Sequence, residues 1–99
     1  MNYKEIINSK PVVLVDFYAD WCPHCVRMKP VVEEIKEALE GKIGVYLIDV
    51  DKEPELEEQE HIDIIPTFVI YRDGGELWRA SGSMSKDALL AQLESALKG

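Results

Sequence analysis

Two cysteines separated by two residues set the strongest constraint on this chain. Cys22 and Cys25 are its only cysteines, and they lie where an apolar run, residues 12–18, meets a segment with helical periodicity. A Cys-x-x-Cys pair at such a junction is typical of a redox-active dithiol. The first turn of a helix has unpaired backbone N–H groups and a partial positive charge, and both stabilise an anion. The sequence therefore predicts an exposed, reactive thiolate at Cys22 and a more deeply buried Cys25 that closes a disulfide with it.

Two other interpretations of the cysteine pair remain open. Two structural thiols would pack in the core, but Pro23 and His24 between them are unusual for that role. A zinc site normally uses four ligands, often as two separated pairs. Beyond the cysteines this chain offers only His24 and His61, and His24 lies inside the pair, where it is poorly placed to reach the same ion. We therefore expect a redox pair with no bound metal and no cofactor.

Length and charge limit the domain organisation and the partners. The 99 residues, 46% of them apolar, are sized for one globular domain, residues 1–99, with a single core. A net charge of −8 disfavours nucleic acid and anionic membranes as partners. The N-terminal residues do not resemble a signal peptide, and no segment resembles a membrane span. We expect a cytoplasmic monomer.

The apolar patterning predicts four helices and four strands. In chain order these are a short helix at 2–8, a strand at 12–19, a helix at 23–39, a strand at 43–50, a short helix near Pro54, a hairpin of strands at 67–71 and 76–80, and a helix from Ser83 or Ser85 to 97. A right-handed crossover makes the first two strands parallel neighbours, and the Asp-Gly turn makes the hairpin antiparallel. The expected fold is an α/β mixed sheet with helices on both faces.

An acidic stretch follows the second predicted strand. Residues 49–60 contain seven acidic residues and one lysine. Such a run is usually a solvated surface, which we favour here over a docking surface. His61, just after the run, is interpreted as a loop or packing histidine.

Asp16 interrupts the apolar run of the first predicted strand. A strand this apolar is expected to be buried on both faces, where a carboxylate is costly and its pKa rises. Asp16 is then either a hydrogen-bonded structural residue or a proton acceptor and donor beneath the cysteines. The second role is favoured because Cys25 must lose its proton before it attacks a mixed disulfide.

With these features in place, the chain resembles the thioredoxin family over essentially its whole length. The resemblance implies a thioredoxin fold that lacks the first strand of full-length thioredoxins and so keeps four strands. The residues that carry it are Val15-Asp16-Phe17-Tyr18-Ala19, Trp21-Cys22-Pro23-His24-Cys25, Pro30, Ile65-Pro66-Thr67, Asp73-Gly74 and Gly82.

The resemblance also implies a role for each residue near the cysteines. Cys22 is the attacking nucleophile, Cys25 is the resolving thiol, and Asp16 is the buried acid–base group. Trp21 packs beside the site.

The resemblance alone adds a second segment, residues 65–67, to the predicted site. The resemblance implies a cis peptide bond between Ile65 and Pro66, opposite the cysteines. The backbone of Ile65 is then free to pair with an extended substrate, a form of strand addition. Thr67 belongs to the same substrate-binding segment.

The chain departs from the family pattern in two places. Pro23-His24 matches the dipeptide of the periplasmic disulfide oxidases, whereas typical thioredoxins have Gly-Pro. Leu47 aligns with the lysine that usually partners the buried acid, so Asp16 should be harder to ionise.

The sequence therefore predicts a thiol–disulfide oxidoreductase that acts on protein disulfides, with Pro23, His24 and Trp21 tuning the cysteine pair. We expect a cytoplasmic reductant, supplied with electrons by a thioredoxin-reductase-like flavoprotein or another dithiol donor. The Pro-His dipeptide instead favours a dithiol oxidase or isomerase. Two further candidate functions are a non-enzymatic docking module with this fold and an electron carrier dedicated to one enzyme.

Overall fold

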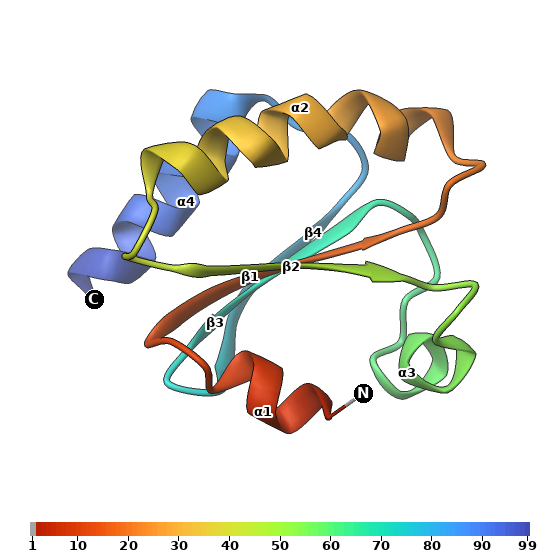
Figure 1. Ribbon diagram of the computed structural model, residues 1–99, viewed down its shortest axis with the longest axis horizontal. Coiled ribbons are helices and arrows are strands. Elements are labelled where there is room, and N and C mark those ends of the chain that lie inside the picture. Colours follow the sequence, from red (N-terminus) through yellow and green to blue (C-terminus); the bar gives the residue numbers. More distant parts are fainter. Residues whose placement is uncertain (1) are drawn as a thin grey trace.

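A computed structural model describes residues 2–99 as one mixed β-sheet between two layers of helices (Figure 1). Among these residues, no helix has both the length and the apolar character needed to span a membrane. The elements are α1 (Tyr3–Ile7), β1 (Val12–Tyr18), α2 (Pro23–Ala38), β2 (Gly44–Asp49), α3 (Pro54–Gln59), β3 (Thr67–Arg72), β4 (Gly75–Ser81) and α4 (Lys86–Lys98).

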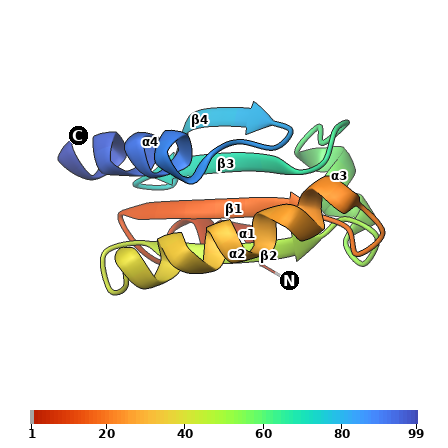
Figure 2. The ribbon, with the colours of Figure 1, turned by 90° about the horizontal axis from the view of Figure 1, so that it is seen from above.

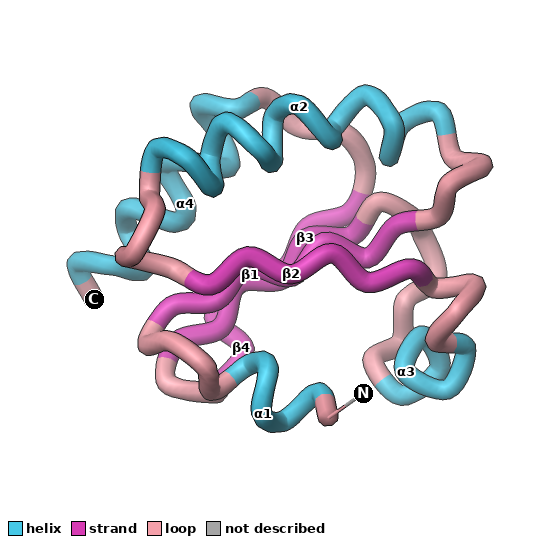
Figure 3. Tube along the Cα trace, viewed as in Figure 1, coloured by secondary structure: helices cyan, strands magenta, loops and turns pink. Residues whose placement is uncertain are grey.

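The strands lie in the order β2-β1-β3-β4. β1 pairs in parallel with β2 and antiparallel with β3, and β3 pairs antiparallel with β4. Figure 3 shows the four strands as one twisted layer. The predicted element order, the four-stranded sheet and its mixed pairing are confirmed.

Two apolar layers sandwich the sheet, because α1 and α3 cover one face and α2 and α4 cover the other (Figure 1). Seen from above, α2 runs along the β1–β2 side and α4 along the β3 side (Figure 2). Alternate residues of β1 enter different layers: Val13 and Val15 pack toward α1 and α3, whereas Leu14 packs toward α2 and α4. The strand is therefore apolar almost throughout because both of its faces are covered.

The helix α2 begins directly after the C-terminal end of β1, at the right-hand end of the sheet in Figure 1. Pro23 occupies the first helical position, where its missing N–H has no intrahelical partner to lose. The buried side chains Met28, Val32 and Ile35 recur at helical spacing and hold α2 against the sheet. This packing fixes where the first turn of α2, with both cysteines, lies.

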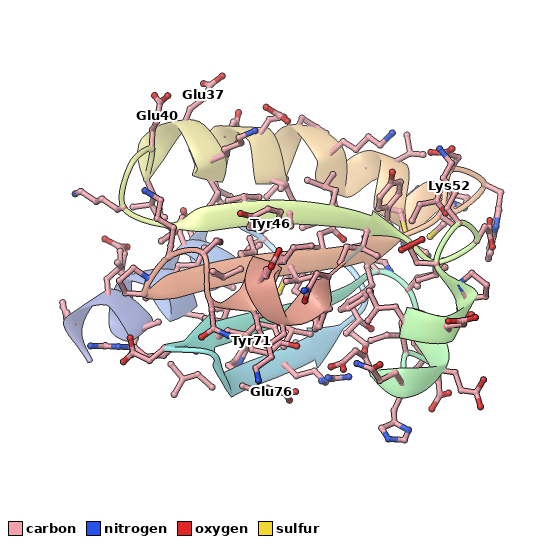
Figure 4. The ribbon with its side chains drawn as sticks, turned by 60° about the horizontal axis from the view of Figure 1, so that its bottom comes forward. Glu37, Glu40, Tyr46, Lys52, Tyr71 and Glu76 are labelled. Atoms are coloured by element: carbon pink, nitrogen blue, oxygen red, sulfur yellow. The ribbon has the colours of Figure 1, made fainter. Side chains whose placement is uncertain are left out.

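Tyrosine hydroxyls tie α1 to the sheet. The Tyr3 and Tyr71 oxygens lie 2.6 Å apart in a buried hydrogen bond, and the Tyr71 hydroxyl also donates to Glu60 Oε1 at 3.3 Å. Tyr46 of β2 donates to Ser9 Oγ at 2.8 Å. Figure 4 shows this face of the sheet with Tyr46 and Tyr71 labelled. A helix of five residues has little stability of its own, so these contacts, with the burial of Tyr3, hold it in place.

The hairpin between β3 and β4 turns at two residues with positive φ, Asp73 at 52° and Gly74 at 82°. A two-residue hairpin turn with positive φ at both positions is the type I′ geometry that Asp-Gly favours. The Asp73 N–H donates to the Pro11 carbonyl at 2.8 Å, which links the turn to the start of β1.

Replacing Gly74 with Ala should therefore lower the free energy of unfolding by about 1–2 kcal/mol, because an L side chain is strained at this φ. The added methyl group would also meet the Asn8 side chain. Urea unfolding followed by circular dichroism measures the change. Gly75→Ala is the matched control, since its added carbon meets only ordinary contacts. An equal loss in both variants would contradict the turn geometry.

Candidate functional site

Cys22 caps the N-terminus of α2 with its own sulfur. The Cys25 backbone N–H donates to Cys22 Sγ at 3.3 Å, and Cys22 has the extended backbone conformation of an N-cap residue. The first turn of α2 contains no acidic residue. Negative charge on this sulfur is therefore stabilised by an N–H group and by the helix terminus, with no carboxylate in that turn to oppose it.

Both cysteines are unpaired and buried, with 4% of Cys22 and 2% of Cys25 exposed. The prediction that Cys22 is exposed is therefore wrong for the protein with unpaired cysteines. The loop before β3 approaches the sulfur, and Cys22 Sγ lies 3.8 Å from the Ile65 carbonyl oxygen. Only a narrow part of Cys22 is open to a second sulfur atom.

Asp16 lies in the middle of β1 and is 1% exposed. Among the described residues, none donates a hydrogen bond to its Oδ1, so the structure offers no support for a hydrogen-bonded structural aspartate. Burial raises the pKa of Asp16 from 3.8 to about 7, and the positive charge of Lys29 opposes part of that rise. Asp16 therefore changes protonation near neutral pH, as a proton-transfer group must.

Cys25 is held in its protonated form. Burial raises the pKa of the Cys25 thiol well above its usual value, and the hydrogen bond with Cys22 and the negative charge of Asp16 add to this rise. The charge of Asp16 therefore acts on the Cys25 thiol. Cys25 needs a base before it can attack, whereas the Cys22 sulfur has direct stabilisation from the helix.

His24 makes two contacts from the first turn of α2. Its Nδ1 lies 2.6 Å from Arg27 Nη2 and 3.2 Å from Ser83 Oγ. Because a guanidinium can only donate, Nδ1 is the accepting nitrogen and the imidazole is neutral in this arrangement. The permanent positive charge beside the first turn is therefore that of Arg27. Sequence reasoning did not include Arg27 or Ser83 in the site. Ser83 could not be found in this way because it reaches His24 from beyond β4.

Trp21 is 68% exposed, and its Nε1–H donates to Asp51 Oδ2 at 2.7 Å. The Asp51 N–H in turn donates to Asp49 Oδ1 at 2.9 Å, and Asp49 is buried. The acidic stretch is thus not a purely solvated surface, because its first two acids support the tryptophan. A signal for this was present: Asp51 follows β2, and parallel β1 and β2 end at the same edge of the sheet.

The segment before β3 forms the opposite wall of the site. The Ile65–Pro66 peptide bond is cis, as the resemblance implied, and the Ile65 carbonyl faces Cys22. The buried Pro66 accepts a hydrogen bond from the Gly82 N–H at 2.8 Å. Thr67 is buried and its hydroxyl bonds to Ile64 and Ser81. Its side chain therefore holds this wall together and is not free to contact a substrate.

Asp16→Asn should make the stability of the reduced protein less dependent on pH. Because folding raises the pKa of Asp16, its contribution is complete below about pH 4 and is lost as pH rises through about 7. At about 1.4 kcal/mol per pKa unit, the parent should lose up to about 4 kcal/mol of unfolding free energy over this range. Urea unfolding at several pH values measures it. The exposed Asp63→Asn is the control, and a pH dependence retained by Asp16→Asn would contradict the assignment.

Comparison with known proteins agrees with this geometry. The family model described as Thioredoxin matches residues 1–95. Thioredoxin Y1 of Arabidopsis thaliana, described as chloroplastic, is 38% identical over 93 residues, which cover 94% of this chain and 54% of that protein. The chain thus spans about half the length of this relative.

A thioredoxin from Alicyclobacillus acidocaldarius is 38% identical over 97 residues, covering 98% of this chain and 92% of that protein. Among solved structures, a mutant thioredoxin from Halobacterium salinarum superposes with a TM-score of 0.88 at 35% identity, covering 96% of this chain and 82% of the other. These matches extend over all the elements that form the site. The chain therefore belongs to the thioredoxin family.

Proposed function

We propose that residues 1–99 act as a single domain that exchanges disulfides with protein substrates through Cys22 and Cys25. The observation that carries the proposal is the cap of α2, where the Cys25 N–H donates to Cys22 Sγ. This cap prepares the Cys22 sulfur for attack. The Cys25 sulfur lies about one helical turn away. Membership in the thioredoxin family supports the same chemistry.

The exchange takes place in two steps. The Cys22 thiolate attacks one sulfur of the substrate disulfide, the substrate S–S bond breaks, and the leaving sulfur takes up a proton. The Cys25 thiolate then attacks Cys22 Sγ, forms the Cys22–Cys25 disulfide and releases the second substrate thiol. Two electrons pass from the cysteine pair to the substrate.

Asp16 supplies the base for the second step. Its raised pKa of about 7 leaves part of the population ionised at neutral pH, and its charge already acts on Cys25. The ionised carboxylate takes the thiol proton of Cys25, directly or through water, as the thiolate forms. It returns that proton when the pair is reduced again.

The substrate binds along the surface around Cys22. The Ile65 carbonyl faces the sulfur, where an extended substrate segment can pair with the backbone. Trp21, Val26 and Ile64 are exposed large apolar side chains on the segments that carry the two cysteines and Ile65. A group of exposed apolar side chains is typical of a surface that binds another protein.

We propose reduction as the direction of exchange, in the cytoplasm, with a thioredoxin-reductase-like flavoprotein or another dithiol donor as the source of electrons. In support of reduction, a solved structure with a TM-score of 0.86 and 25% identity concerns the thiol-resolving mechanism of a yeast mitochondrial peroxiredoxin via glutathione and thioredoxin systems. The competing function is dithiol oxidation or isomerisation, which Pro23-His24 favours. The reduction potential against glutathione distinguishes the two directions.

An insulin assay with dithiothreitol tests the proposed activity. The parent should precipitate reduced insulin faster than dithiothreitol alone, and Cys22→Ala should remove the gain because no nucleophile remains. Cys25→Ala should trap mixed disulfides through Cys22, visible on non-reducing gels, whereas Cys22→Ala should not. A rate at background from the parent would leave a docking module as the better interpretation. Slow insulin reduction with rapid turnover of one partner would indicate a dedicated electron carrier.

Replacing Pro23-His24 by Gly-Pro should lower the reduction potential of the cysteine pair by at least about 30 mV, which is a tenfold change in the equilibrium constant for thiol–disulfide exchange. His24 Nδ1 accepts a hydrogen bond from Arg27 Nη2, which keeps the guanidinium charge beside the first turn of α2. A positive charge in this place favours thiolate over disulfide. Equilibration with glutathione measures the potential, and His61→Asn is the control. Equal potentials for the parent and the Gly-Pro variant would mean that His24 does not tune the pair.

A further inference from the structure

Neither of the two residues that pair with Asp16 in the sheet is charged. Its partner in β2 is Leu47 and its partner in β3 is Phe68, both uncharged. A carboxylate that is 1% exposed, with an unbonded Oδ1, is strongly disfavoured without a nearby cation. Any positive charge that helps Asp16 to ionise must therefore come from an element packed on the sheet.

Lys29 of α2 lies over the part of β1 that follows Asp16. Its Nζ is 5.7 Å from the centroid of the Tyr18 ring, a cation–π arrangement. Tyr18 is two residues after Asp16 in β1, so both side chains point to the same side of the sheet. Lys29 is also one helical turn after Cys25, on the same side of α2. The contact with the ring thus places the Lys29 ammonium on the side of β1 that carries Asp16.

The other titratable groups here do not supply a positive charge. The charge of Asp16 acts on Cys25 of α2 and on Tyr18 of β1, and neither of these groups is a cation. Asp49 from β2 and Asp20 from the loop after β1 act on Tyr18, and both carry negative charge. Lys29 is the charge that lowers the pKa of Asp16 against burial.

We propose that Lys29 is a positioning residue that governs proton loss from Asp16, with the Tyr18 ring holding its ammonium in place. The N-terminus of α2 thereby carries the two cysteines, and the same helix carries the positive charge that favours ionisation of Asp16, the proposed base for Cys25. The effect of Lys29 on Asp16 is independent of any activity, but its consequence for Cys25 rests on the proposed function.

Direct titration of Asp16 tests the inference without any enzyme assay. The background is the full chain with Cys22→Ser and Cys25→Ser, in which no thiol titrates. Carboxyl carbon NMR of labelled aspartate at low ionic strength, where screening is weak, follows the Asp16 midpoint. Lys29→Gln should raise the proton affinity of Asp16 at least about threefold, half a pH unit, because an opposing charge is lost. Lys29→Arg should keep the midpoint of the background.

Two further variants make the result specific to the site. Lys29 and Lys36 are both exposed, so Lys36→Gln removes the same charge from a similar environment two turns further along α2 and should leave the Asp16 midpoint unchanged. Leu47→Lys, added to Lys29→Gln, places a cation on the β2 residue that pairs with Asp16 and should return the midpoint toward lower pH. Equal midpoints for Lys29→Gln and Lys36→Gln would overturn the inference.

The active chain then separates this inference from the proposed function. In the parent cysteine background, Lys29→Gln should move the pH dependence of mixed-disulfide resolution upward by the shift that NMR records, while Lys36→Gln should not. An NMR shift without a kinetic shift would sustain Lys29 as the cation for Asp16 and overturn Asp16 as the base for Cys25. Equal shifts of the NMR midpoint and of the kinetic pH dependence would support both Lys29 as the cation for Asp16 and Asp16 as the base for Cys25.

Discussion

The burial of β1 on both faces of the sheet is the constraint on which the candidate site depends. Helices cover each face, so the strand must be apolar, and its C-terminal end is where the chain leaves the core. Cys22 and α2 begin there. The same burial surrounds Asp16, the one charged residue in the strand. The nucleophile and its proposed base therefore result from one packing arrangement.

Burial acts on the three reactive groups in different ways. It raises the pKa of Asp16 to about 7 and also raises the pKa of Cys25, because both lose solvation when charged. The Cys22 sulfur is also buried, but it accepts an N–H at the start of a helix, which replaces part of the lost solvation. This difference is the physical basis of the proposal that Cys22 attacks first and that Cys25 attacks later, when a base is needed.

The site is a surface rather than a cavity. A groove of about 910 Å³ between α1 and α3 is lined by neither cysteine nor by Asp16. Of the five exposed large apolar side chains among residues 2–99, three lie on the segments next to the cysteines and Ile65. A narrow opening at Cys22, surrounded by exposed apolar side chains, suits an extended protein segment better than an enclosed small molecule.

Local sequence patterns determined the elements and pointed to the candidate reactive residues. The Cys-x-x-Cys spacing, the lone Asp16 in an apolar strand and the Asp-Gly turn each depend on residues close in the chain, and period and turn chemistry predict such features. Only the tertiary structure decided which distant side chains meet. The burial of Cys22 against Ile65, the support of Trp21 by Asp51 and the position of Lys29 over Tyr18 join residues 43, 30 and 11 positions apart. These contacts depend on strand register and on how helices pack on the sheet, which sequence periodicity does not encode.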